Sequence, residues 1–276
     1  MLSIRTPCWR CAVSPFAAAM LIVLAGCGGR SADVAPGPVT GGVASPQTID
    51  ALWVRATDLL VRRKWDDAAV AFERLLLETR TGDPRLPRAR YNLAEARLGQ
   101  KSNLQAVREF RRVADDFATD SLAPVALVRA GEAYAALWRR PELDPTYGTV
   151  ARATLQEVLT RFPGTPAAAR ADAGIAALDD KFAYKALRNA AFYQRYKAYD
   201  SAILLLKDLI ATWPRTRVAP DAIEHLIETY RILGYAEDVR DTCEYFRRQH
   251  PTSPRLDATC PVPAVPAPPT GATPGS

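Results

Sequence analysis

The stretch from Leu187 to Thr216 constrains the fold more than any other part of this sequence, because it has the pattern of one helical hairpin. Small residues recur where two helices must approach closely, and large apolar residues recur where the groove between them must be filled. One hairpin cannot bury its apolar face alone, so this copy predicts neighbours. The positions at helical spacing are Ala190 and Tyr193 in the first helix and Ala202, Leu206 and Leu209 in the second, which Pro214 ends.

Four further copies of the pattern indicate a solenoid of stacked hairpins. The order of small, aromatic, alanine and large residues before a closing proline resembles the tetratricopeptide (TPR) repeat. The closing prolines Pro214 and Pro251 lie 37 residues apart. The sequence therefore predicts an all-α fold, an α-solenoid of about five TPR-like hairpins. The corresponding positions elsewhere are Ala56, Leu59, Ala68, Phe72 and Leu75; Ala94, Ala106, Phe110 and Val113; Gly131, Tyr134, Ala151, Leu155, Val158 and Pro163; and Ile227, Tyr230, Val239, Cys243 and Phe246.

The third copy departs from the regular period. The segment Leu137–Pro145 contains two prolines and an Asp-Pro step, which predict an inserted loop before a helix at 146–162. No helix breaker then follows until Lys197, so an extended helix is expected at about 167–196. Its extra turns could pack two sub-arrays against each other or present a surface to a partner. The earlier helices are expected at 49–63, 65–80, 86–99, 102–117 and 122–138.

Composition and charge fit a globular chain without a nucleic-acid surface. The 276 residues are 48% hydrophobic and 24% charged, enough to bury a sizeable core as one or two domains. The formal net charge of +6 is spread along the chain rather than gathered in blocks. Basic residues in that arrangement favour a solvated surface over nucleic-acid binding.

Residues 1–26 have the features of a lipoprotein signal peptide. Arg5 and Arg10 give a positive start, and the apolar run that follows is shorter than the about 20 residues of a membrane span. The ending Leu24-Ala25-Gly26-Cys27 resembles a bacterial lipobox. That resemblance implies cleavage before Cys27 and lipidation of its thiol. The alternative is an ordinary signal peptide with a chance cysteine. Cys8 and Cys11 have metal-pair spacing but lie in the removed segment.

The resemblance also predicts the location and the domain boundaries. Two or three acyl chains on Cys27 would anchor the protein firmly. Gly28 rather than Asp follows the cysteine, which resembles the outer-membrane-sorted class, so a lipid-anchored position on the periplasmic face of the outer membrane is expected. Residues 27–46 are predicted to be the lipidated cysteine with a flexible tether, 47–252 the solenoid, and 253–276 a disordered Pro-rich tail.

Residues for catalysis, metal binding or cofactor binding are not evident in the sequence. His225 and His250 fall on separate predicted helices without ligands at suitable spacing, and no Gly-rich phosphate loop is present. The chain is therefore expected not to be an enzyme. Cys243 and Cys260 could pair in an oxidising compartment. Because Cys243 occupies a core-facing position, we favour a buried free thiol and leave the disulfide open.

A lipobox, a short tether and five hairpins together resemble the BamD family, the lipoprotein subunits of the outer-membrane β-barrel assembly machine. The resemblance spans residues 48–252. In place of the family's usual Lys-Arg-Gly, this chain has Arg195-Tyr196-Lys197, and its first repeat lacks the usual Tyr-Pro ending. The segments that carry the resemblance are Leu143-Asp144-Pro145, Arg161–Pro166, Ala191-Phe192-Tyr193, Ala198-Tyr199 and Leu209–Pro214.

This resemblance implies a scaffold in β-barrel assembly. The implied partners are a BamA-like insertase bound through its POTRA domains, other lipoproteins of the complex, unfolded outer membrane proteins, and the membrane through the lipid anchor. Nucleic acid is not among them. A TPR groove would bind peptide through the first helix of each repeat, although Leu60 and Leu98 could equally pack between repeats. The groove candidates are Trp53, Thr57, Leu60, Arg88, Tyr91, Asn92, Glu95 and Leu98.

The turn of the fourth repeat is the predicted site for the insertase. Arg195, Tyr196 and Lys197 are expected to contact an acidic patch of a POTRA domain, and a solvated basic turn is the alternative interpretation. Two other functions remain open. One is a different TPR lipoprotein, such as a pilus-secretin pilotin or a cell-envelope division factor, whose array would keep an even period. The other is an enzyme on a helical scaffold.

Overall fold

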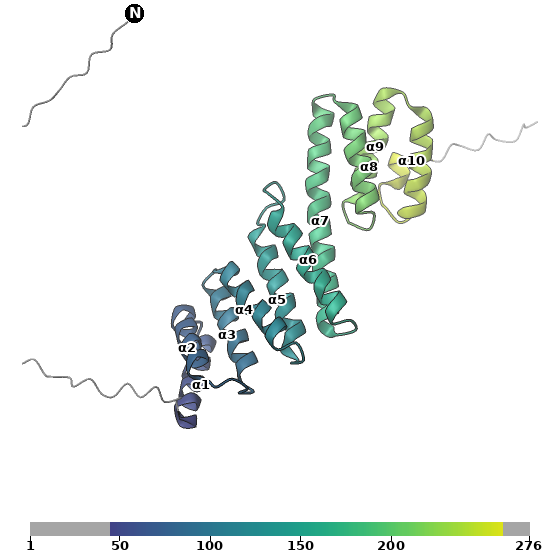
Figure 1. The fold of residues 1–276 in the computed structure, drawn as a ribbon. Coiled ribbons are helices and arrows are strands. Elements are labelled where there is room, and N and C mark those ends of the chain that lie inside the picture. The colour runs from purple at the N-terminus through teal and green to yellow at the C-terminus, as the bar shows by residue number, and fades with distance from the viewer. Residues whose placement is uncertain (1–44, 262–276) are drawn as a thin grey trace, which may run out of the picture. The chain divides into compact units, whose positions relative to one another are not determined.

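The computed structural model describes residues 45–261, and in that range the chain forms helices and no strand (Figure 1). The predicted all-α solenoid of five hairpins is confirmed, and the helices are found within a few residues of their predicted bounds. They are α1 (Pro46–Val61), α2 (Trp65–Glu78), α3 (Leu86–Gly99), α4 (Asn103–Asp116), α5 (Leu122–Leu137), α6 (Thr146–Arg161), α7 (Pro166–Arg195), α8 (Tyr199–Thr212), α9 (Ala219–Leu233), α10 (Ala236–Gln249) and α11 (Leu256–Thr259).

Of the two predictions about the ends of the chain, only the one about the tail falls on residues that the structure describes. The signal peptide, Cys27 and most of the tether lie outside the described residues. The tail, predicted to be disordered from Ser253 onward, contains the short helix α11 and then Cys260, which is 1% exposed. The prediction of disorder is therefore wrong for residues 256–260.

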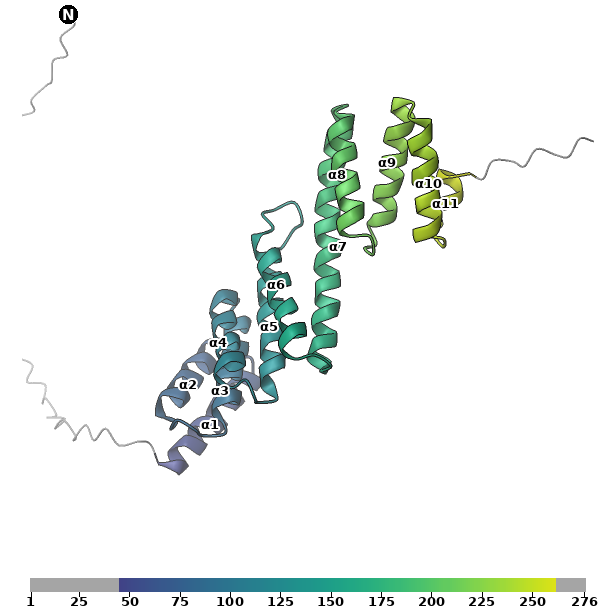
Figure 2. The same ribbon diagram turned by 45° about the vertical axis from the view of Figure 1, so that its right-hand side comes forward.

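Successive helices pack side by side in chain order, as both ribbon views show (Figures 1 and 2). Local sequence signals start several of them. Ser45 caps α1 ahead of Pro46, and Thr165 caps α7 ahead of Pro166. In α7 the Thr165 hydroxyl accepts a hydrogen bond from the backbone N–H of Ala168 at 3.2 Å. A hydroxyl cap followed by proline suits a helix start. The hydroxyl accepts a hydrogen bond from a backbone N–H that has no partner within the helix, and proline has no N–H at a position where one would be left unpaired.

The core follows the predicted register at most positions. Ala68 and Ala202 are fully buried where neighbouring helices meet, and the large residues Phe72, Phe110 and Leu206 fill the spaces between helices. Tyr193 is the exception, since 38% of its surface is exposed and the sequence placed it between helices. Its neighbour Gln194 faces α9 instead and hydrogen-bonds to it, which turns Tyr193 toward solvent.

The extended helix α7 joins two apolar clusters. Its first half packs Ala171, Ile175 and Leu178 into the cluster that α5 and α6 form. Its second half packs Ala183 and Ala190 into the cluster of α8, α9 and α10. Of the two roles that the sequence left open, packing two sub-arrays together is therefore observed.

The inserted loop after α5 is fixed on the middle of α7. Trp138 is almost fully buried, and its ring centroid lies 4.6 Å from that of Phe182 on α7. The Lys181 ammonium donates to the Trp138 carbonyl and lies 4.5 Å from the Trp138 ring centroid. Lys185 donates to the carbonyl of Leu143 at 2.9 Å. Burial lowers the pKa of Lys181. The loop is thus a packed element at the joint between the two clusters.

Cys243 and Cys260 form a disulfide, so the favoured prediction of a free thiol is wrong. Cys243 does face the core, as predicted, but no further hairpin covers that side of α10 in the described residues. The segment that includes α11 lies there and brings Cys260 to it.

Candidate partner-binding surfaces

An exposed aromatic and apolar surface lies at the end of α7 and the start of α8. Tyr196 is 71% exposed and Leu204 is 70% exposed, and further exposed rings adjoin Tyr196, so the apolar surface here is continuous. The Phe192 ring lies 4.6 Å from the Tyr196 ring and 5.6 Å from the Tyr193 ring, measured between centroids. Phe192, Tyr193 and Leu204 line a groove of about 510 Å³. We call this surface the α7 end patch; its residues are Phe192, Tyr193, Arg195, Tyr196, Lys197 and Leu204.

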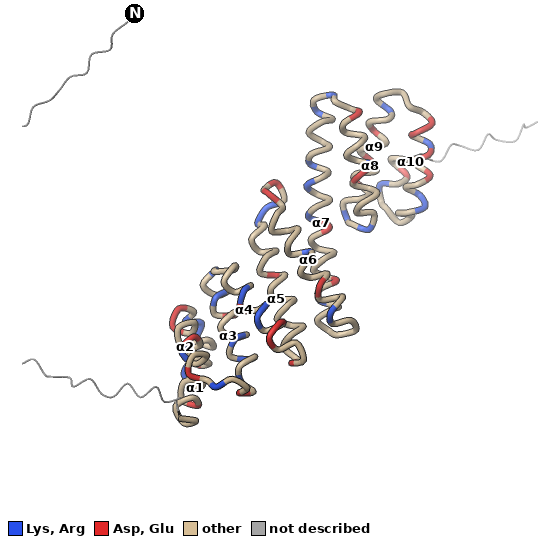
Figure 3. The backbone as a smooth tube through the Cα atoms, in the orientation of Figure 1, with Lys and Arg blue, Asp and Glu red and all other residues tan. Residues whose placement is uncertain are grey.

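The α7 end patch has a basic edge. Figure 3 shows basic positions at the turn between α7 and α8. Arg195 and Lys197 are both exposed, and neither forms an ion pair with any other residue from 45 to 261. Asp200, at the start of α8, is the nearby acidic residue in sequence. Free cations beside exposed aromatic rings are well suited to an acidic partner surface.

A partly buried group of hydrogen bonds holds the end of α7 against α9. The Gln194 amide donates to the His225 carbonyl at 3.0 Å and to the Thr229 hydroxyl at 2.6 Å. Its oxygen lies 2.7 Å from Nδ1 of His225, which is placed to donate to it. Because Gln194 stands between Tyr193 and Arg195, these bonds fix which side chains of the turn face solvent.

Lys197 has a left-handed backbone with φ of 59°. It closes the turn after α7, and Arg63, Lys101 and Gly234 have the same place after α1, α3 and α9. Glycine adopts this conformation freely, whereas a residue with a Cβ is destabilised by roughly 1–2 kcal/mol. The chain therefore keeps a cation in the exposed turn at some cost in stability.

We expect Lys197→Gly to stabilise the fold by about 1 kcal/mol, because glycine removes the left-handed strain. Urea unfolding followed by circular dichroism measures the change. Lys101→Gly is the matched control and should be stabilising to a similar degree, since Lys101 has the same conformation with φ of 61°. Equal or lower stability of both variants would contradict this explanation of the turns.

The groove candidates lie on α1 and α3, which contact each other. Trp53 packs edge-on against Phe72, with ring centroids 6.3 Å apart, and Leu60 packs on the same cluster. The Thr57 hydroxyl donates to the Trp53 carbonyl at 2.8 Å. On α3, Leu98 packs between repeats, Arg88 is exposed and Asn92 is half-buried. The structure brings all eight residues onto two neighbouring helices.

An ion-pair ladder, which the sequence did not reveal, crosses the first helices of three hairpins. Arg129 on α5 donates to both carboxylate oxygens of Glu95 on α3, at 2.7 and 2.6 Å. Arg129 also pairs with Glu132 at 3.0 Å, and Arg170 on α7 donates to Glu132 at 2.7 Å. Burial, with Glu95 adding to it, raises the pKa of Tyr91 to about 12. Both oxygens of the Glu95 carboxylate are therefore already paired with Arg129 inside the protein.

Residues 45–261 lack two other kinds of feature. No helix there combines the length and apolar character needed to cross a bilayer. No group of three or more His, Cys, Asp and Glu side chains in that range is placed to hold a metal ion.

The chain is similar to a known protein family and to a known assembly factor. Residues 46–246 match the model of a family described as YfiO, outer membrane lipoprotein. A curated relative is the outer membrane protein assembly factor BamD of Vibrio cholerae serotype O1, which is 32% identical over 103 residues. That match covers 37% of this chain and 43% of the relative, so it spans less than half of either protein.

Two solved structures are similar at low scores. A thermophilic TPR protein from Thermus thermophilus is 21% identical, with 76% of this chain and 95% of that chain covered and a TM-score of 0.33. TPR-like repeats of a putative kinesin light chain from Podospora anserina are 15% identical, with 76% and 99% covered and a TM-score of 0.33. The assignment of the fold therefore rests on the helical hairpins themselves.

Proposed function

The chain belongs to the YfiO family of outer membrane lipoproteins, and on that basis we propose that it is a lipid-anchored scaffold that supports the assembly of β-barrel proteins in the outer membrane. The name of the relative, an assembly factor, supports this function over that of a pilotin or a division factor. The proposed role requires binding and no turnover.

The observation that carries the proposal is the α7 end patch. Aromatic and arginine side chains contribute most of the energy of many interfaces. Here the exposed rings of Phe192 and Tyr196 lie against each other, and Arg195 is exposed in the same last turn of α7. We propose that this patch binds an acidic surface of a POTRA domain on a BamA-like insertase. Lys197 would then govern the association rate and its dependence on salt, as exposed charges at a rim do.

The first helices of the N-terminal hairpins would receive a different partner. On α3, Arg88 is exposed and Asn92 is half-buried, and half-buried rings are offered by Tyr91 on α3 and Trp53 on α1. Such a surface suits an extended apolar peptide, so we propose that unfolded outer membrane proteins bind there. Helix α7 packs into the clusters on both sides of it, and its Arg170 joins the ion-pair ladder that reaches Glu95 on α3, so α7 would link the two binding regions.

We expect Cys27→Ser to abolish lipid attachment, because the thiol is the proposed acylation site. Metabolic labelling with a clickable palmitate should give no signal on the variant, and the uncleaved chain should run larger than the wild type on a gel. Cys260→Ser is the control and should keep the label. Labelling of Cys27→Ser at the wild-type level would contradict the lipobox assignment.

We expect the double variant Arg195→Glu with Lys197→Glu to lower co-purification with the insertase about tenfold at low salt, since two attractive charges become repulsive. The matched control is Arg63→Glu with Lys101→Glu, which makes the same charge change at equivalent turns of other hairpins. Circular dichroism confirms that both variants fold. Wild-type recovery of the insertase by the first variant, even at high salt, would place the contact elsewhere.

A further inference from the structure

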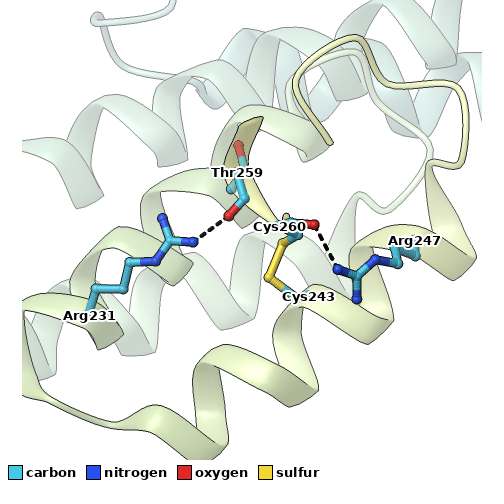
Figure 4. Close-up of a disulfide and its surroundings, with 5 residues drawn as sticks. All are labelled: Arg231, Cys243, Arg247, Thr259 and Cys260. Carbon is cyan, nitrogen blue, oxygen red and sulfur yellow. Dashed lines mark hydrogen bonds between the residues drawn. A yellow bond between two sulfur atoms is a disulfide. The ribbon is translucent and has the colours of Figure 1, made fainter. Parts of the chain in front are cut away.

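The last described segment is fastened onto the end of the solenoid by a disulfide. Cys243 on α10 is bonded to Cys260, 17 residues later in the chain (Figure 4). Both cysteines belong to the apolar cluster of α7 to α10, and they are 6% and 1% exposed. We call residues 255–260, together with this bond, the C-terminal clasp.

Three arginines add hydrogen bonds to the C-terminal clasp. Arg247 on α10 donates to the Cys260 carbonyl at 2.7 Å, and Arg231 on α9 donates to the Thr259 carbonyl (Figure 4). Arg255, just before α11, pairs with Asp221 at 2.8 Å on the other end of α9. Helix α11 has four residues, too few to persist without such support. Its position therefore depends on the disulfide and on these contacts.

Helix α9 connects the C-terminal clasp to the α7 end patch. Asp221 and Arg231, near the two ends of α9, hold the clasp. His225 and Thr229 on the same helix hold Gln194, which sets the orientation of the turn after α7. Ala190 and Cys260 also lie in one continuous apolar cluster. Undocking of the clasp should therefore make local opening of α9 easier. Through Gln194, it should also make local opening of the patch easier.

We propose that oxidation of Cys243 and Cys260 is a maturation step that locks the last hairpin and thereby holds the α7 end patch in its binding arrangement. The chain is then a substrate of a protein dithiol oxidant, that is, a protein whose own disulfide accepts the two electrons. Only the link to partner binding rests on the function proposed above.

The reaction is a pair of thiol–disulfide exchanges. The Cys260 thiol loses its proton and attacks the disulfide of the oxidant, which forms a mixed disulfide and releases one thiolate of the oxidant. The Cys243 thiolate then attacks the Cys260 sulfur, forms the bond seen here and expels the second thiolate. Two protons and two electrons leave this chain, and the oxidant becomes a dithiol. Cys260 reacts first because it follows a four-residue helix, whereas Cys243 is fixed within α10.

Burial protects the disulfide from reduction once the clasp is docked. Exchange back to thiols needs a thiolate to reach one of the sulfurs, and both cysteines are almost fully covered once the clasp is docked. The arginine contacts to the Thr259 and Cys260 carbonyls help keep it docked. Oxidation therefore occurs before docking is complete and persists afterwards.

The first test measures the thiols in the exported full-length protein. Alkylation of the denatured protein, followed by mass spectrometry, should find Cys243 and Cys260 blocked by each other in wild-type cells. Both should be alkylated in cells that lack the dithiol oxidant of the compartment. Free thiols in protein from wild-type cells would overturn the proposal.

The second test measures hydrogen exchange of the oxidised protein against Cys243→Ser with Cys260→Ser and against wild type reduced in place. Amides of α9 to α11 and of residues 190–197 should exchange about tenfold faster without the bond, which corresponds to opening that is about 1.4 kcal/mol easier. Helices α1 to α4 provide the internal control and should not change. Unchanged exchange at residues 190–197 would overturn the coupling.

The variant Gln194→Ala separates the contact between α9 and the turn from the effect of the disulfide itself. With the disulfide intact, this variant should speed exchange at residues 192–197 and leave α11 as protected as in the wild type. Faster exchange in α11 as well would show that Gln194 supports the whole C-terminal hairpin and would overturn its role as a local contact between α9 and the turn. If these exchange results hold but the reduced protein binds the insertase normally, the link from the disulfide to partner binding fails, whereas the maturation step and the function proposed for the patch both stand.

Discussion

Ala202→Arg is expected to lower the free energy of unfolding by roughly 3–5 kcal/mol, because it places an unpaired charge between packed helices. Ala202 is fully buried at the start of α8, where that helix meets the second half of α7. The helices cannot separate locally, since Leu206 and Leu209 fix the same face of α8 in the core. Urea unfolding monitored by circular dichroism gives the value.

Ser201→Arg is the matched control for this prediction. It adds the same side chain one position earlier, where the residue is exposed, and its effect should stay within about 0.5 kcal/mol. A variant at Ala202 that unfolds at the wild-type urea concentration would show that α8 does not have the register described above.

Trp138→Ala is expected to cost about 3–5 kcal/mol, since it removes a large buried aromatic side chain and leaves a cavity. Trp138 is 1% exposed and touches both Phe182 and the Lys181 ammonium on α7. Its ring also lies over Gly148, where an added Cβ would be 2.3 Å from a ring carbon. The variant should release the inserted loop from α7, and limited proteolysis should then cut between residues 138 and 145.

Tyr147→Ala tests whether any aromatic near the loop has this effect. Tyr147 is 38% exposed at the start of α6, so its removal should cost about 1 kcal/mol or less and leave the loop resistant to protease. Equal losses for the two variants would contradict the role given to Trp138 as the anchor of the loop.

The sequence predicts the hairpins well because their signals are local. Phe72, Phe110 and Leu206 lie in the core as expected, since their spacing from neighbouring alanines already describes a helix face. The length of α7 follows from the lack of a breaker between Pro166 and Lys197. Both features depend on residues within one or two helices.

Features that depend on distant partners were not predicted. Tyr193 was placed in the core because no local signal reveals that Gln194 bonds to α9, 31 and 35 residues away. The disulfide depends on α11, which is too short to have a periodic pattern. The bonds of Arg129 to Glu95 and of Arg170 to Glu132 join residues 34 and 38 positions apart.

The candidate site was predicted in part. Exposure of Arg195, Tyr196 and Lys197 agrees with the turn that the sequence indicated, while their contact with a partner stays a prediction. Phe192 and Leu204 were missed, because large apolar residues on a helix are usually assigned to the core. Two observations could have pointed to them: Leu204 is one of three consecutive leucines, which cannot all face one side of a helix, and Phe192 directly precedes Tyr193.

The central claim is that this chain binds the insertase of β-barrel assembly through the end of α7. Affinity purification of the tagged, lipidated protein from detergent-solubilised envelopes, with mass spectrometry of bound proteins, tests it most directly. We predict that a large β-barrel protein with POTRA domains co-purifies with the wild type and with Arg63→Glu, Lys101→Glu, and is largely lost with Arg195→Glu, Lys197→Glu. Recovery of a secretin or a division protein in place of such an insertase would contradict the account.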